Sequence, residues 1–172
     1  MKGFTLLEVL VAITVFLVVA LALGYALVAG KSALLASDIP TQLRQDLIFS
    51  VGALTHDLRQ TAPSKTSIGA GTSASTITFR IPEDTDSDGD VVDAAGNIEW
   101  GDEITYAVDG QGRLIRSEGV SSAVVAPDIS LLQFSRPAAE DAILQIDIAA
   151  SKIDGQGKSY QDSEQAVVKM RN

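Results

Sequence analysis

An apolar run from Phe4 to Gly30 constrains this chain more than any other feature of its sequence. The run exceeds the roughly 20 residues that a helix needs to span a membrane. Glu8 interrupts it near its start, and a carboxylate inside such a helix costs up to about 3 kcal/mol. An ionisable residue within a membrane span is by default a functional group with a partner, so we expect Glu8 to have one.

The amino terminus of a cleaved chain is a natural partner for Glu8. Residues i and i+4 of a helix lie on one face, which places Glu8 beside Phe4. Cleavage after Gly3 would give Phe4 an ammonium group, available to its own Glu8 or to that of a neighbouring copy. A secretory signal peptide has an apolar core of about 7 to 15 residues, which is shorter than this run. A plain signal anchor explains the length but leaves Glu8 without a purpose.

The segment GFTLLEV, residues 3–9, preceded by a short leader and followed by an apolar helix, closely resembles the type IV prepilin signature of pilins and type II secretion pseudopilins. The resemblance implies that a prepilin peptidase removes leader residues 1–3 by cutting between Gly3 and Phe4, and that Phe4 is then N-methylated. It also implies that Glu8 pairs with a neighbouring subunit's terminus. The expected setting is a single-pass protein of the bacterial inner membrane, with its head in the periplasm. Its partners would be membrane lipid, inner-membrane assembly machinery and other pilins or pseudopilins.

The remainder of the chain has room for one modest head domain, and this domain is acidic. The net charge of the 172 residues is -9, and residues 64–172 carry nine Lys/Arg against eighteen Asp/Glu. Nucleic acid is therefore not an expected partner, since phosphate binding needs a basic surface. The chain has no cysteine, which rules out disulfides and cysteine-based sites.

Residues 31–63 have the pattern of an amphipathic helix that covers a surface of the head. Apolar residues recur at spacings of three and four at Leu43, Leu47, Val51, Leu54 and Leu58. Pro40 predicts a kink or short break near residues 38–40, and Pro63 ends the helix. His56, the only histidine, is expected on the surface of this helix. With no proline before Pro40, the sequence favours a minor pilin or pseudopilin over those major pilins that have a kinking proline in the span.

After a Gly/Ser/Thr-rich connector at residues 64–75, the hydrophobic period changes to two, which predicts strands. The expected strands are Thr76–Ile81, Glu103–Val108, Arg113–Ser117, Ile129–Phe134, Ala142–Ala149 and Glu164–Met170, with a hairpin turn at residues 109–112. Strands that follow a helix in a block predict an α+β, pilin-like fold. In this fold, the transmembrane and filament-core helix (residues 4–30) continues into the amphipathic helix, which packs on a single antiparallel β-sheet in the β-rich head (residues 64–172).

The order of these segments also resembles the W-type minor pilin of type IV pili and the J-type minor pseudopilin of type II secretion. The function expected from this resemblance is that of a subunit that primes or caps a pilus or pseudopilus. The alternative is a signal-anchored periplasmic binding protein or enzyme. No nucleophile elbow, His-carboxylate cluster or phosphate loop is found in the sequence, so we expect no enzymatic activity.

An acidic loop is the one feature of the head sequence that suggests a bound ligand. Asp84, Asp86 and Asp88 with the following glycine match the first half of a calcium loop. The twelfth position, which supplies a bidentate glutamate in an EF-hand, is Ala95. Asp90, Asp93 or a remote residue would then have to complete the shell. Calcium is thus a candidate cofactor of this loop, and a solvated acidic loop is the alternative.

Overall fold

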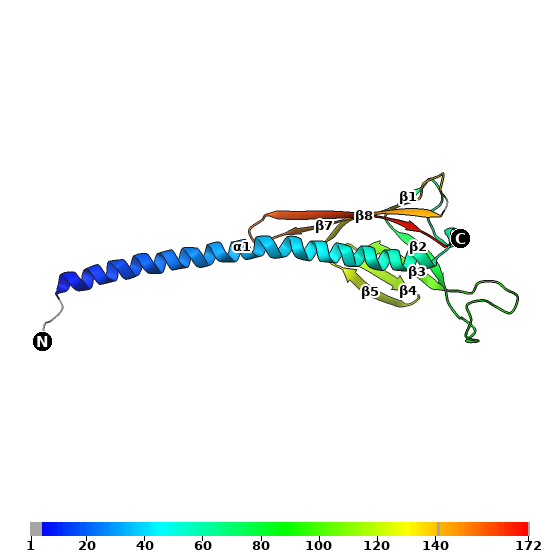
Figure 1. Ribbon diagram of the computed structural model, residues 1–172, viewed down its shortest axis with the longest axis horizontal. Coiled ribbons are helices and arrows are strands. Elements are labelled where there is room, and N and C mark those ends of the chain that lie inside the picture. Colours follow the sequence, from blue (N-terminus) through cyan, green and yellow to red (C-terminus); the bar gives the residue numbers. More distant parts are fainter. Residues whose placement is uncertain (1–4, 141, 172) are drawn as a thin grey trace. The chain divides into compact units, whose positions relative to one another are not determined.

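The computed structural model describes residues 5–140 and 142–171, and of residues 32–37 the backbone alone. The chain divides into two compact units, residues 1–39 and 40–172. One helix, α1 (Leu6–Gln60), contributes to both units (Figure 1). The break predicted near residues 38–40 is absent, because the helix continues through Pro40. One proline removes a single backbone donor, and this loss does not end a helix whose flanking turns remain hydrogen-bonded.

Over the described residues, the head consists of the second part of α1 and eight antiparallel strands, which confirms the α+β, pilin-like prediction. α1 ends at Gln60, and Pro63 opens a short 3-10 helix, η1 (Pro63–Lys65), as expected of a residue that starts helices more readily than it continues them. The strands are β1 (Ser73–Ala74), β2 (Ile77–Pro82), β3 (Trp100–Val108), β4 (Leu114–Glu118), β5 (Ser121–Ala126), β6 (Ile129–Ser135), β7 (Ile143–Ile153) and β8 (Ser159–Lys169).

These strands form two four-stranded sheets, where the sequence pattern suggested one. One sheet has the order β2-β3-β4-β5, and the other has the order β1-β6-β7-β8. All six predicted strands are present with shifted ends, and the turn at residues 109–112 joins β3 to β4. Strands β1 and β5 were not predicted. β1 is only two residues long, and the sequence SSAVVA of β5 has no apolar alternation.

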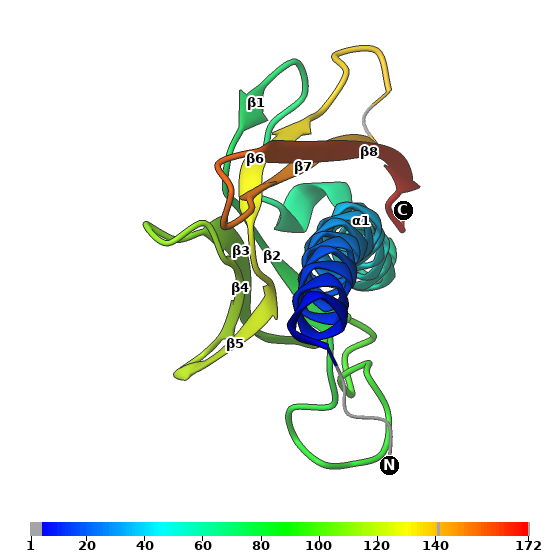
Figure 2. The same cartoon turned by 90° about the vertical axis from the view of Figure 1, so that its left-hand side faces the viewer.

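The core of the head lies where α1 packs into the angle between the two sheets (Figure 2). The helix contributes Leu43, Leu47, Leu54 and Leu58, four of the five residues on the predicted apolar face, whereas the fifth, Val51, is only half-buried. The first sheet contributes Ile77, Phe79, Ile104, Tyr106 and Leu114, and the second contributes Phe134, Leu144, Ile146, Ile148 and Val168. The apolar period of 3.6 in the helix and of 2 in the strands is thus satisfied in one shared core.

Candidate functional site

The start of α1 is held by Thr5 and Glu8 through a reciprocal pair of contacts. The carboxylate oxygen Oε2 of Glu8 accepts the backbone N–H of Thr5 at 3.2 Å, and the backbone N–H of Glu8 is 3.4 Å from the Thr5 hydroxyl. Thr5 precedes the first helical residue and Glu8 is third in the helix, which is the arrangement of a capping box. Glu8 therefore has Thr5 as a partner within its own chain, whereas the partner expected above was the Phe4 ammonium. The spacing Thr-x-x-Glu was the signal that could have identified it.

The predicted processing site, Gly3 and Phe4, lies outside the described residues. Directly after it, residues 6–31 form a helix long and apolar enough to cross a membrane by length and composition. None of this segment is buried within the chain. Its large apolar side chains include Phe16 at 75% and Leu27 at 75% exposure. A continuous apolar surface of this kind requires lipid or protein to cover it.

In the head, the face of α1 turned away from the core carries an unusual set of residues. Ile48 and Phe49 are 57% and 67% exposed, and Gly52 and His56 follow along the same face. We call these four residues the outer ridge. His56 lies on the helix surface, as predicted. Gly52 has no neighbouring atom within 4 Å of the point where a Cβ would lie, so packing within the chain does not require a glycine there.

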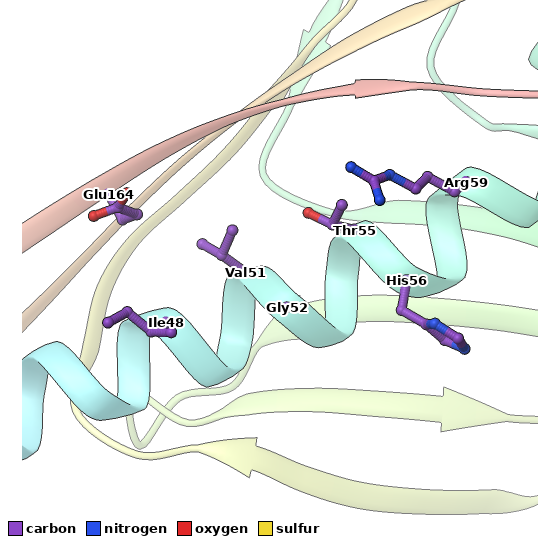
Figure 3. A pocket seen from close by; sticks show the side chains of 7 residues that line it. All are labelled: Ile48, Val51, Gly52, Thr55, His56, Arg59 and Glu164. Atoms are coloured by element: carbon purple, nitrogen blue, oxygen red, sulfur yellow. The ribbon is translucent and has the colours of Figure 1, made fainter.

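A cleft runs along each side of the outer ridge. The cleft towards β8 has a volume of about 480 Å³ and is lined by Ile48, Gly52 and His56 of the ridge and by Val51, Thr55, Arg59 and Glu164 (Figure 3). Thr55 and Arg59 point to the β8 side of the helix, whereas His56 points to the other side. The Thr55 hydroxyl is buried and has no hydrogen-bond partner in the described part of the chain.

The other cleft, of about 610 Å³, lies between the outer ridge and strands β3 and β4. A partly buried ionic network forms one of its walls. Asp57 Oδ2 accepts a hydrogen bond from the Tyr106 hydroxyl at 3.0 Å and forms an ion pair with Arg116 Nε at 2.8 Å. Arg116 also pairs with Glu118 through its Nη1 atom. Burial is the main cause that raises the pKa of Tyr106, and the charge of Asp57 is the next. Burial alone would lower the pKa of Arg116. The hydrogen bonds to Asp57 and Glu118 outweigh this effect, so the pKa of Arg116 is raised. The network fixes α1 to the β3–β4 hairpin.

The acidic loop lies between β2 and β3, in the green segment that extends beyond the strands in Figure 1. Asp84, Asp86 and Glu99 each have a carboxylate oxygen within 4.8 Å of the others, a group that could hold a metal ion. Two predicted ligands, Asp84 and Asp86, belong to this group. The predicted ligands Asp88 and Asp90 do not, and Glu99 supplies the remote carboxylate that the sequence could not identify.

Backbone contacts explain why the carboxylates of this loop converge. Asp84 accepts the N–H groups of Ser87 at 2.7 Å and Gly89 at 2.9 Å. Glu99 Oε2 accepts the N–H of Thr85 at 2.6 Å and its hydroxyl at 2.7 Å. Glu99 is therefore brought to the loop by Thr85, ten or more residues away in the chain, which no periodic pattern would indicate.

Comparison with known proteins identifies one matching family description, the prokaryotic N-terminal methylation motif, over residues 1–24. No curated protein and no solved structure matches the chain. The chain thus carries an N-terminal methylation motif of the type IV pilin and pseudopilin class, followed by an apolar helix, and the head has no characterised counterpart among these comparisons.

Proposed function

We propose that this protein is a minor pilin or minor pseudopilin that primes or caps a type IV pilus or a type II secretion pseudopilus. A prepilin peptidase cuts the precursor between Gly3 and Phe4 and methylates Phe4, while the apolar helix holds the protein in the inner membrane. The observation that best supports this proposal is the methylation motif joined to 26 residues of membrane-type helix, of which none is buried in the chain. That exposed helix then passes from lipid into the interior of a filament.

Intact-mass and N-terminal analysis of the membrane-extracted protein tests this proposal directly. The protein is produced with and without a prepilin peptidase. A chain that begins at methylated Phe4 only when the peptidase is present supports the filament function. An unprocessed Met1, or a start near Gly30, supports the alternative of an anchored or secreted periplasmic protein.

Glu8 has two roles in this proposal, and three substitutions separate them. Its capping role needs only an acceptor oxygen, whereas subunit pairing needs the charge. Glu8→Gln keeps the cap and removes the charge, Glu8→Ala removes both, and Thr5→Ala weakens the cap alone. We expect all three variants to be cleaved, and only the two Glu8 variants to be lost from sheared filaments. Normal incorporation of Glu8→Gln together with loss of Thr5→Ala would assign Glu8 to the cap instead.

The outer ridge is the surface of the head that a neighbouring filament subunit would cover. Three features support this assignment: the exposed side chains of Ile48 and Phe49, the open helix surface at Gly52, and the Arg59 guanidinium in the adjoining cleft. Glycine in a helix interior costs about 1 kcal/mol relative to alanine, so its presence here favours close approach by another chain. The partner would present an apolar helix surface to the ridge and a carboxylate to Arg59.

Photo-crosslinking in the host that assembles the filament tests the ridge. A crosslinking amino acid at Phe49 should capture another protein that a prepilin peptidase has cleaved and whose new N-terminal residue is methylated. The matched control is Leu131, which is 50% exposed on β6. Capture from Leu131 but not from Phe49 would remove the ridge from the subunit interface while leaving the N-terminal processing result unaffected.

We further propose that the acidic loop binds calcium through Asp84, Asp86 and Glu99. The affinity would be that of extracellular modules, with a Kd of roughly 0.1 to 1 mM. Isothermal titration of the whole protein should show calcium heat that Glu99→Gln abolishes and that Asp90→Asn leaves intact. If Asp90→Asn removes the heat instead, the calcium ligands are those expected from the sequence. If the unmodified protein gives neither heat nor a thermal shift, the loop holds no calcium.

A further inference from the structure

A polar cleft on the outer side of β2 and β3 differs from the rest of this acidic head in its charge and its aromatic content. It has a volume of about 530 Å³ and is lined by Ser64, Lys65, Thr66, Ser67, Thr78, Arg80, Trp100 and Glu103. It contains two of the nine basic residues of segment 64–172 and the only tryptophan of the chain, and it has no aliphatic lining residue. We propose that this cleft binds a saccharide bearing a carboxylate.

Trp100 provides a flat apolar surface within the polar cleft. Its side chain is neither fully buried nor fully exposed, and the Lys65 ammonium lies over its ring, 5.2 Å from the centroid. This cation–π contact positions the indole and places a positive charge above one face of the ring. A sugar ring that stacks its C–H face on the part of the indole left uncovered by Lys65 would direct a carboxylate to the ammonium.

Arg80 and Glu103 lie on the neighbouring strands β2 and β3 as directly opposed residues. Opposite charges at such positions are close enough to pair. Both residues are exposed, and no ion pair joins them in the described part of the chain. The guanidinium is therefore available for bidentate binding of a carboxylate, and the Glu103 carboxylate is available to accept sugar hydroxyls.

The floor of the cleft is fixed by hydrogen bonds among its hydroxyl-bearing residues. Thr78 and Thr105 share a hydrogen bond of 3.1 Å across β2 and β3. The Thr78 N–H donates to the Ser67 hydroxyl at 3.0 Å, and the Thr66 hydroxyl donates to the Pro63 carbonyl at 3.2 Å. These bonds hold the segment after η1 against β2. The oxygens lining the cleft keep further acceptor capacity, and their positions are set before a ligand arrives.

The combination of these groups defines the ligand class. The two cations favour an anionic ligand. The carboxylate and the hydroxyl groups of the cleft favour a ligand rich in hydroxyl groups, and the indole favours a ring with an apolar face. An apolar ligand would leave all of these polar groups unpaired. A carboxylated sugar satisfies each of them. This binding activity goes beyond the proposed filament function and does not depend on it.

Fluorescence titration of the whole protein in detergent micelles tests the proposal, because the only tryptophan lies in the cleft. The probes are trigalacturonate, the neutral trisaccharide maltotriose, and acetate at matched ionic strength. Trigalacturonate should give a saturable change in emission. Arg80→Gln and Lys65→Met should each weaken its binding about tenfold, since each removes a charge-assisted hydrogen bond. Lys158→Met is the matched control, because Lys158 also lies over an aromatic ring, that of Tyr160, but not in this cleft.

Three results would overturn the proposal. Equal affinity for maltotriose would show that the cations do not select the ligand. Equal affinity for acetate would show that the sugar ring is not recognised. The absence of saturable binding of trigalacturonate, by fluorescence and by calorimetry, would remove the site altogether. Urea unfolding of each variant separates lost binding from lost folding, and cleavage at Phe4 is scored separately, so failure here does not bear on the filament function.

Discussion

The two parts of helix α1 obtain their partners from different places. Residues 6–31 are apolar on all sides and none of them is buried within the chain, whereas Leu43, Leu47, Leu54 and Leu58 are almost fully buried between two sheets. The same backbone geometry thus serves two environments. The first part depends on lipid or other subunits for its coverage, and the second on its own chain. Substitutions in the two parts should accordingly affect different properties of the protein.

The largest contrast should come from truncating a leucine in each part. Leu54→Ala removes a fully buried side chain, and we expect it to destabilise the head by about 2 to 5 kcal/mol because it leaves a cavity. Leu17→Ala changes a side chain that is 54% exposed and should leave the stability of the head unchanged. Urea unfolding of the whole protein in micelles, followed by Trp100 fluorescence, measures both effects. Equal destabilisation by the two variants would contradict the division into separately covered parts.

The ionic network at Asp57 sharpens the comparison, because it is a polar contact that only the second part of α1 makes. Asp57→Ala removes one of the two ion pairs of Arg116, leaving the pair with Glu118, and leaves the Tyr106 hydroxyl without its acceptor, so we expect a loss of roughly 2 to 3 kcal/mol. Lys152→Ala, which breaks the more exposed pair with Asp128, should cost at most about 1 kcal/mol. The same unfolding measurement compares them, and a smaller effect at Asp57 would show that the network contributes little to stability.

Gly52→Ala should separate the stability of the chain from its assembly. Alanine favours a helix interior by about 1 kcal/mol over glycine, and open space surrounds this position, so the head should become more stable by up to that amount. If another subunit covers the outer ridge, the added methyl group should at the same time reduce recovery of the protein in sheared filaments. A variant that is both more stable and normally incorporated would show that nothing approaches the helix closely at Gly52.

The pH dependence of head stability should show the smallest effect. Burial, and then the nearby Asp57 carboxylate, raises the pKa of Tyr106 above its usual value. A raised folded-state pKa means that this contribution to stability is complete below the unfolded pKa of about 10 and is lost as the pH rises through the folded pKa. Urea midpoints should therefore decline above about pH 10 in the unmodified protein. In Tyr106→Phe the decline should be shallower, and an identical slope would remove Tyr106 as its cause.

Local patterns in the sequence were sufficient for most of the elements of the fold. The apolar run predicted the membrane-type helix, the leucines at spacings of three and four predicted the buried face of α1, and alternation predicted six of the eight strands. These predictions succeeded because the period of burial follows directly from helix and strand geometry. Pro40 was predicted to cause a kink or a short break, and the break was wrong, since one proline does not end a helix whose flanking turns remain hydrogen-bonded.

The sequence by itself determined the membrane-type helix with its methylation motif, the α+β class and the acidic character of the head, because each of these is a property of neighbouring residues or of composition. Only the tertiary structure decided the division into two sheets, the meeting of Asp57 with Tyr106 and Arg116, and the approach of Glu99 to Asp84 and Asp86. The cleft that joins Lys65, Arg80 and Trp100 was decided in the same way. These contacts join residues that are far apart in the chain. They are set by strand pairing and helix packing, which no local periodicity in the sequence indicates.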